Sequence, residues 1–156
     1  MLIANLNKVR ELSWKERRLL VQSALLLPVV HLALFVLGYA RLHRVMERLT
    51  PSKPGDRTLS ESETLKRAGE ITRLVSIAAG HGLYRATCLR KSLLVWWFLR
   101  KDGIQSNICF GVRMIDSTLE AHAWVEWNGM ILNDSTTVRE QFQTLRDALP
   151  ATRLGL

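Results

Sequence analysis

The sequence predicts an α+β fold in which helices come first and an antiparallel sheet follows them. Apolar residues recur at helical spacing as far as Lys101, and from Asn107 onward they alternate with polar residues, as in strands. The pair Asn128-Gly129 separates two strand-like segments and is typical of a hairpin turn. Helical segments followed by neighbouring strands indicate an α+β architecture. With 156 residues, of which 47% are hydrophobic, the chain is expected to form a single compact core.

The N-terminal segment is strongly apolar. Ser13 and Glu16 form a capping-box pattern, which predicts that a helix starts at Trp14. No Asp, Glu, Lys or Arg occurs from Leu19 to Ala40, a length sufficient to cross a bilayer. Two interpretations follow. The segment is either a helix that spans or lies on a membrane, or a pair of helices buried in protein and joined or kinked at Pro28.

The composition divides the chain into an apolar helical annex at 1–50, a linker at 51–57 and a larger unit at 58–156. The linker contains two prolines and a glycine. A second capping-box pattern, Ser60 to Glu63, predicts another helix, which is expected to stop at Gly80. Its apolar stripe consists of Leu65, Ala68, Ile71, Val75 and Ala78.

The segment Cys88–Lys101 is apolar nearly all round, which predicts a central, buried helix. Gly103 suits the left-handed position that follows a helix. The elements expected after it are three strands and a short final helix: 107–113, 121–127, 130–134 and 138–149.

The formal charge of +8 favours acidic partners. Nucleic acid is not expected, because the chain has no zinc-finger spacing and no basic stretch with interleaved aromatic residues. The two cysteines, Cys88 and Cys109, are typical of an intracellular chain with reduced thiols, so a cytoplasmic location is expected. Cys109 is interpreted as a core residue. The other histidines have no ligand spacing, so neither a metal nor a cofactor is predicted.

Three residues together suggest chemistry, although each alone has an ordinary structural explanation. Cys88 begins the central helix, with Thr87 as its predicted cap, and the unpaired amides and dipole at a helix N-terminus favour the nucleophilic thiolate. His122 lies on one predicted strand and Asp134 at the end of the next. A thiol, an imidazole and a carboxylate supply a nucleophile, a base and a group that orients the base.

The hairpin register decides whether this triad can form. A two-residue loop at Asn128-Gly129 pairs Asp134 with Ala123, which puts Asp134 and His122 on opposite faces of the sheet. A three-residue loop pairs Asp134 with His122 directly and requires a left-handed residue, which Gly129 suits. The sequence therefore predicts a three-residue or bulged loop with positive φ at Gly129.

Three stretches resemble a known family. They are CLRKSL, which starts at Cys88, FGVR, which ends at Arg113, and AHAWVE around His122, followed by Leu132-Asn133-Asp134. Together they resemble the leader peptidases of lasso-peptide biosynthesis, the B proteins, within the transglutaminase-like superfamily. The resemblance implies a transglutaminase-like or papain-like core, with a central helix packed on an antiparallel sheet. It also implies a catalytic triad of Cys88, His122 and Asp134.

The resemblance further implies that the chain cuts a ribosomal precursor between its leader and core peptides, before an ATP-dependent cyclase closes the core. Because the annex shows no strands for a leader-binding domain, a separate leader-binding protein is expected as a partner. The resemblance favours burial of 19–40 against the protease domain or a partner. Two alternatives stay open: an acyltransferase that uses the same triad, and a non-catalytic, membrane-associated scaffold.

Overall fold

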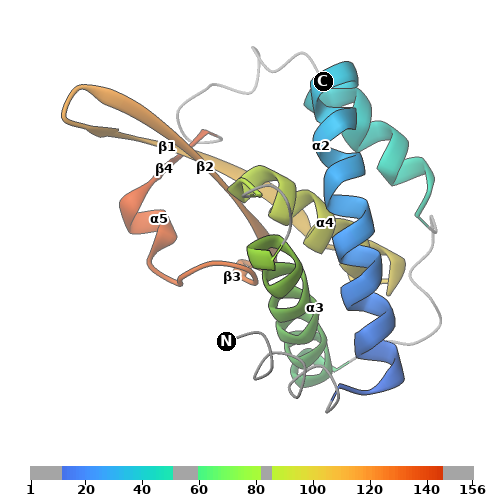
Figure 1. Ribbon diagram of the computed structural model, residues 1–156. Coiled ribbons are helices and arrows are strands. Elements are labelled where there is room, and N and C mark those ends of the chain that lie inside the picture. Colours follow the sequence, from blue (N-terminus) through green and yellow to red (C-terminus); the bar gives the residue numbers. More distant parts are fainter. Residues whose placement is uncertain (1–11, 51–59, 82–85, 146–156) are drawn as a thin grey trace.

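The structure is a computed structural model that describes residues 12–50, 60–81 and 86–145. The helices precede the sheet, as the α+β prediction requires (Figure 1). In chain order, the described elements are α2 (Trp14–Arg48), α3 (Glu61–His81), α4 (Cys88–Lys101), β1 (Asn107–Ile115), β2 (Thr118–Trp127), β3 (Met130–Ile131), α5 (Val138–Gln141) and β4 (Gln143–Thr144). The predicted linker at 51–57 lies outside the described residues.

Both predicted capping boxes are confirmed. The Ser13 hydroxyl accepts a hydrogen bond from the Glu16 amide (3.3 Å), and the Glu16 carboxylate accepts one from the Ser13 amide (2.9 Å). Ser60 and Glu63 make the same pair of bonds at the start of α3. Each box satisfies two amides that the helix itself leaves unpaired, and this is why the two helices start where the sequence predicts.

The second interpretation, in which two helices are joined or kinked at Pro28, is wrong about the position of the bend, because α2 bends at Gly38 instead. Pro28 lies inside the helix on its exposed side, where its ring does not disturb the core. Gly38 has φ 72° and ψ 170°, a conformation that glycine adopts at little cost. Beyond it the helix turns into a second arm, whose His43 stacks on Trp96 of α4 with ring centroids 4.3 Å apart. The bend thus keeps the second arm on the protein.

The two faces of α2 have different surroundings. Four residues spaced three or four apart are buried toward α3 and α4: Leu19, Ser23, Leu27 and Val30. The opposite face is exposed. By length and composition alone, α2 is the one described helix that could cross a membrane. The expected burial of 19–40 therefore holds for one face of the helix.

The main core surrounds α4, which lies between α2 and the sheet (Figure 1). It includes Leu93, Leu94 and Leu99 of α4 and Val125 of β2, all with essentially no exposed surface. Helix α3 contributes Ala68, Ile71, Leu74, Val75 and Ala78. Four of these belong to the predicted stripe, whereas its fifth member, Leu65, is exposed. The prediction of a central, buried helix at Cys88–Lys101 is confirmed.

The sheet is antiparallel, with strand order β3-β2-β1-β4. Strands β1 and β2 form a long hairpin that projects from the body of the molecule (Figure 1). The predicted helix at 138–149 is shorter than expected: α5 ends at Gln141, Phe142 is extended, and β4 then pairs with β1. Its last residues, 146–149, lie outside the described part of the chain. This segment buries Val138 and Phe142 against Trp124, forming a second, smaller core.

The predicted three-residue loop between β2 and β3 is wrong. Trp127 pairs with Met130 and Glu126 with Ile131, which leaves a two-residue loop. Gly129 has the predicted positive φ (79°), but Asn128 also has a positive φ (47°). Two left-handed residues make the turn whose twist matches that of the flanking strands, and asparagine accepts this conformation more readily than most residues. Strand β3 also ends at Ile131, earlier than the predicted 134.

Candidate active site

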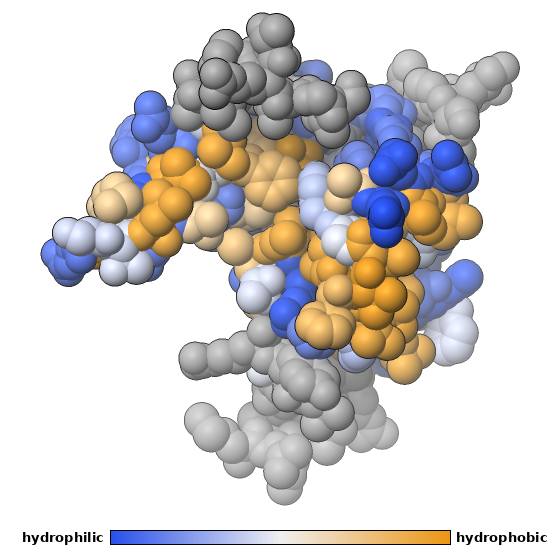
Figure 2. Space-filling view, turned by 90° about the horizontal axis from the view of Figure 1, so that it is seen from above, coloured by the Kyte–Doolittle hydropathy of each residue, from blue (hydrophilic) through white to orange (hydrophobic). Residues whose placement is uncertain are grey.

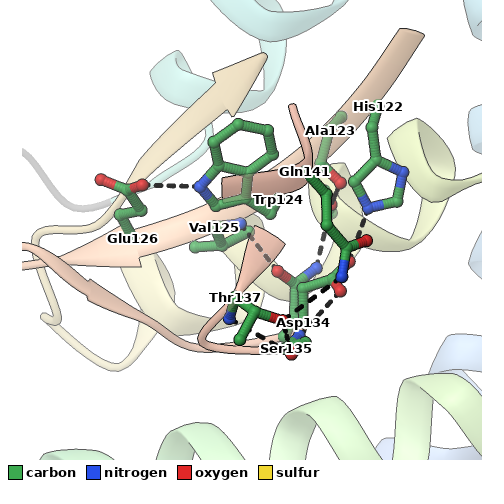
Figure 3. Close-up of polar contacts among 11 residues, drawn as sticks. His122, Ala123, Trp124, Val125, Glu126, Asp134, Ser135, Thr137 and Gln141 are labelled. Atoms are coloured by element: carbon green, nitrogen blue, oxygen red, sulfur yellow. Dashed lines mark hydrogen bonds and ion pairs between the residues drawn. The ribbon is translucent and has the colours of Figure 1, made fainter. Parts of the chain in front are cut away.

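His122 and Asp134 lie together although the hairpin has the two-residue register. The amide of Leu132 still donates to the Val125 carbonyl (2.9 Å), as it would in a continuing strand. The Val125 amide, however, donates to the Asn133 side chain (2.7 Å), and the chain bends out of the sheet there. Asp134 Oδ2 thereby comes within 2.6 Å of His122 Nε2 (Figure 3). Asp134 therefore reaches His122 because the chain leaves the sheet after Leu132. The sequence had predicted that a three-residue or bulged loop would bring the two residues together.

The pair is suited to general base chemistry. An Nε2–H that donates to Asp134 leaves Nδ1 as the nitrogen that can take up and release a proton. The second carboxylate oxygen of Asp134 accepts a hydrogen bond from the Ser135 amide (2.7 Å), which fixes the orientation of the carboxylate. The His122 side chain is 23% exposed and that of Asp134 30%, so a substrate can reach both.

Aromatic rings hold the imidazole from the sheet side. His122 stacks on Phe142 with ring centroids 4.8 Å apart and an angle of 22° between the planes. Trp124 lies nearly parallel to His122 at 6.2 Å. Phe142, which sequence analysis missed, follows α5 directly and reaches the site because β4 pairs with β1. Nothing in the local sequence pattern signals this long-range contact.

Glu126 fixes α5 to the sheet and so supports Phe142 from a distance. Its carboxylate accepts a hydrogen bond from Trp124 Nε1 (2.6 Å; Figure 3) and another from Arg139 Nη2 (2.6 Å). Burial raises the pKa of Glu126, but the hydrogen bonds from Arg139 and Trp124 outweigh burial, and its pKa lies below the ordinary value. Glu126 is therefore charged at neutral pH and anchors the segment that packs on His122.

Gly111 leaves room for these rings. It pairs with His122 across the β1–β2 ladder, so a side chain at this position would point to the face that His122 occupies. A Cβ there would lie 2.8 Å from the Phe142 Cβ and 2.9 Å from the Trp124 ring. Both distances are shorter than van der Waals contact. Position 111 therefore admits only glycine if Trp124 and Phe142 are to keep their places.

We expect Gly111→Ala to destabilise the fold by about 1–3 kcal/mol, the usual cost of overpacking, and to lower catalytic activity because Trp124 and Phe142 must shift. Urea unfolding and initial rates measure the two effects. Gly69→Ala is the matched control: its Cβ meets nothing within 4 Å, and alanine is the better helix former, so stability should hold or rise. Wild-type stability and activity in Gly111→Ala would contradict this account.

Cys88 begins α4 and carries a partly buried, free thiol. One turn later, Ser92 donates a hydrogen bond to the carbonyl of Ala123 (2.9 Å), the residue after His122. Residues four apart share a helix face, so Cys88 and Ser92 lie on the same side of α4. The contacts of the described residues include no hydrogen bond between the Cys88 thiol and His122. The structure thus joins His122 to Asp134 and places Cys88 one helical turn from the contact between α4 and β2.

The prediction of Thr87 as the cap of α4 is confirmed in position only. Thr87 occupies the N-cap position, but its hydroxyl makes no capping hydrogen bond. The amides at the start of α4 are therefore not occupied by this side chain. Amides in such a position suit the stabilisation of an oxyanion next to Cys88.

A surface pocket of about 440 Å³ opens beside the imidazole. Its lining includes His122, Asp134 and Phe142, together with Arg113 and Glu120. The last two form an ion pair across the β1–β2 ladder, with Arg113 Nε 2.8 Å from Glu120 Oε2. The pocket adjoins the His122–Asp134 pair and is open to the surface. In residues 12–50, 60–81 and 86–145, no group of three His, Cys, Asp or Glu side chains is arranged to hold a metal ion.

Comparison with protein-family models matches residues 26–147 to the transglutaminase-like superfamily. The match begins within α2 and includes α3, α4 and the whole sheet, which is well over half of the chain. Comparison with curated proteins gave no significant match, and comparison with solved structures gave none. The family model covers the helix that starts at Cys88, both strands of the long hairpin and the His122–Asp134 pair. The chain therefore belongs to the transglutaminase-like superfamily.

Proposed function

We propose that this protein is a cysteine protease that removes the leader peptide from a lasso-peptide precursor, with Cys88, His122 and Asp134 as its triad. The observation that carries the proposal is the 2.6 Å contact between Asp134 and His122. His122 lies on β2, the strand to which Ser92 of the Cys88 helix is hydrogen-bonded. Membership of a superfamily that includes cysteine proteases supports the chemistry. The resemblance of the CLRKSL, FGVR and AHAWVE stretches to lasso-peptide leader peptidases supports the substrate.

In the proposed mechanism, the Cys88 sulfur attacks the carbonyl at the junction of leader and core. His122 accepts the thiol proton at Nδ1 and later delivers it to the departing amine of the core peptide. Asp134 holds Nε2–H and stabilises the imidazolium that forms in between. Water then attacks the acyl-enzyme, with His122 as base, and releases the leader as a carboxylic acid.

The cleavage product suits the expected next step. Cleavage frees the α-amine of the core peptide, and closing a ring through that amine requires activation of a side-chain carboxylate by ATP. We therefore propose that a separate ATP-dependent cyclase consumes the product. This protein needs neither a metal nor a cofactor for its own step, because the triad supplies the nucleophile, the base and the proton.

The decisive experiment incubates the purified protein with a candidate lasso-peptide precursor and follows the mass of every peptide. A protease yields the leader as a free acid and the core with a free amine. An acyltransferase, supplied with a small primary amine, yields a leader amide instead of the acid. A non-catalytic scaffold leaves the precursor intact even when the leader-binding protein is present. The second and third outcomes would each refute the proposed proteolysis.

We expect cleavage to be slow without a separate leader-binding protein. With micromolar precursor, that protein should raise the initial rate by roughly tenfold or more. Tethering a substrate beside an active site raises its effective concentration. Residues 12–50 and 60–81, which are described parts of the chain that precede α4, contain helices and no strand to which a leader could pair. Initial rates with and without the partner measure the effect. A precursor with a scrambled leader is the control and should not be stimulated. Full-rate cleavage by this chain alone would count against a separate partner.

A further inference from the structure

The outer face of α2 carries a continuous apolar stripe. Phe35 is 85% exposed, Leu25 68% and Leu32 63%. These residues and Val21, Val29 and Val36 recur every three or four positions, so they lie along one side of the helix. The buried residues of α2 lie on the other side, against α3 and α4. Isolated exposed apolar residues are ordinary, but a contiguous stripe of this kind marks an interaction surface.

Positive charges stand at both ends of the stripe. Lys15 and Arg18 are exposed before it, and Arg41, Arg44 and Arg48 are exposed after it. No acidic residue occurs between Glu16 and Glu47. In Figure 2, hydrophobic side chains gather over α2 and strongly hydrophilic ones lie next to them. The stripe on α2 is apolar, has basic residues at both ends and has no acidic residue along it. It therefore complements a bilayer, which is apolar inside and, when it contains anionic lipids, negatively charged at its surface.

The fold argues against α2 crossing the bilayer. One face of α2 packs on α3, whose outer side carries charged residues such as Lys66, Glu70 and Arg73. Arg73 also forms an ion pair with Glu16 (2.5 Å), which ties α3 to the start of α2. A helix that spanned hydrocarbon in this arrangement would draw these charges in with it, at high cost. The stripe can meet lipid only if α2 lies along the membrane surface.

The chemistry of the stripe favours lipid over another protein. Protein interfaces are about as polar as the rest of a protein surface and carry roughly one hydrogen bond per 100–200 Å². From Val21 to Leu37 the exposed positions of α2 are all apolar, over roughly 25 Å at 1.5 Å per residue. Gln22 and His31 are the polar side chains that are partly exposed on this stretch, so the surface offers a protein partner few side-chain hydrogen bonds, whereas acyl chains require none.

We propose that α2 lies in the plane of an anionic bilayer, with its Val21–Val36 stripe inserted at the boundary between head groups and acyl chains and the basic residues at its ends on the head groups. Helices with one apolar face and nearby basic residues bind membranes in this way. Helix α4 lies between α2 and the sheet (Figure 1), and the lining of the pocket beside His122 includes no residue of α2. The pocket therefore stays open to a soluble peptide while the protein is bound to the membrane.

Vesicle flotation tests this proposal with phosphatidylcholine vesicles, with and without phosphatidylglycerol. We expect the protein to float with the anionic vesicles and to bind them more weakly at high salt, because salt screens the basic residues but not the apolar stripe. Leu25→Ser combined with Leu32→Ser should weaken binding at least tenfold, roughly, because each leucine loses the gain from burial in lipid. Arg18→Glu combined with Arg41→Glu should abolish the preference for anionic vesicles. Circular dichroism checks that each variant is folded, which is expected because all four side chains are exposed.

A matched control changes two equally exposed apolar residues elsewhere. Met114→Ser combined with Leu119→Ser, on the β1–β2 hairpin, should leave vesicle binding unchanged. Absence of binding to anionic vesicles would overturn the proposal, and so would binding that resists both high salt and carbonate, which indicates a spanning helix. A dimer or a complex with the leader-binding protein that the Leu25→Ser and Leu32→Ser changes dissociate, without any vesicle binding, would assign the stripe to protein instead.

Discussion

Cys88→Ala is expected to abolish precursor cleavage, with the rate falling on the order of 10⁴-fold or more, as when the nucleophile of a catalytic triad is removed. Alanine keeps the start of α4 helical, so the fold and precursor binding should persist. Mass spectrometry of the precursor over time measures the residual rate, and pull-down of uncut precursor measures binding. In the wild-type protein, iodoacetamide should label Cys88 and block cleavage at the same rate as it labels.

The matched control is Cys109→Ala. Cys109 lies on β1 and packs against the small core of Trp124, Val138 and Phe142. Alanine there removes one partly buried sulfur, so we expect cleavage near the wild-type rate and a loss of stability below about 1.5 kcal/mol. If Cys109→Ala abolished cleavage and Cys88→Ala did not, the nucleophile would be wrongly assigned. If neither change affected cleavage, the proposed covalent mechanism would fail.

Local signals were sufficient to predict most of the helical part of the fold. The hydrogen bonds of a capping box form between residues three apart, so Ser13-Glu16 and Ser60-Glu63 could be recognised without any tertiary information. Gly103 was likewise predicted to be left-handed from its position after an apolar segment, and its φ is 82°. The bounds of α4 follow from the same reasoning.

Features set by packing could not be predicted in this way. Pro28 costs a helix interior about 3 kcal/mol in general, so it was the natural place to expect a kink. Contacts of α2 with α3 and α4 hold the helix straight at Pro28. The helix bends at Gly38 instead, before the second arm, whose His43 contacts Trp96 of α4. The pairing of β4 with β1, which brings Phe142 to His122, joins residues more than thirty positions apart. No pattern within a single segment carries that information.

At the site, some features could be predicted from local signals, whereas others are set by packing and could not. The residue types and chain order of Cys88, His122 and Asp134 were enough to propose a triad, and register reasoning correctly required Asp134 to reach the His122 face. The predicted route, a three-residue or bulged loop, was wrong, because the reasoning assumed that β3 continues to Asp134. The strand ends at Ile131, since the side chain of Asn133 takes the place of a backbone carbonyl opposite Val125. A side chain that replaces a backbone partner is invisible to an argument based on strand register.

Asn133 thus has the central structural role at the site. Its Oδ1 accepts a hydrogen bond from the Val125 amide (2.7 Å), and its Nδ2 donates to the Ser92 hydroxyl (2.9 Å). Ser92 in turn donates to the Ala123 carbonyl (2.9 Å) and has no exposed surface. One amide side chain therefore connects β2, α4 and the segment that carries Asp134. A carboxamide carries its acceptor oxygen and its donor nitrogen on two separate atoms, so Asn133 can bond the Val125 amide and the Ser92 hydroxyl at the same time.

We expect Asn133→Ala to lower the cleavage rate by roughly 10²–10⁴-fold, approaching the loss seen when the orienting carboxylate of a triad is removed. The Val125 amide and the Ser92 hydroxyl would each lose a partner near the core, which costs about 1–3 kcal/mol per buried group. Asp134 would then no longer be held on the His122 face. Initial rates and urea unfolding measure both effects, and Asn107→Ala, at the exposed start of β1, is the matched control.

The comparison with Asp134→Ala separates positioning from mere stability. If Asn133 acts by placing Asp134, the double variant should be scarcely slower than Asp134→Ala alone, because the two changes remove the same contribution. Asn133→Asp should retain a partial rate, since a carboxylate can still accept from the Val125 amide but cannot donate to Ser92. Multiplicative effects in the double variant would mean that Asn133 stabilises the fold without positioning Asp134. Wild-type cleavage by a folded Asn133→Ala protein would show that the bend after Leu132 places Asp134 by itself.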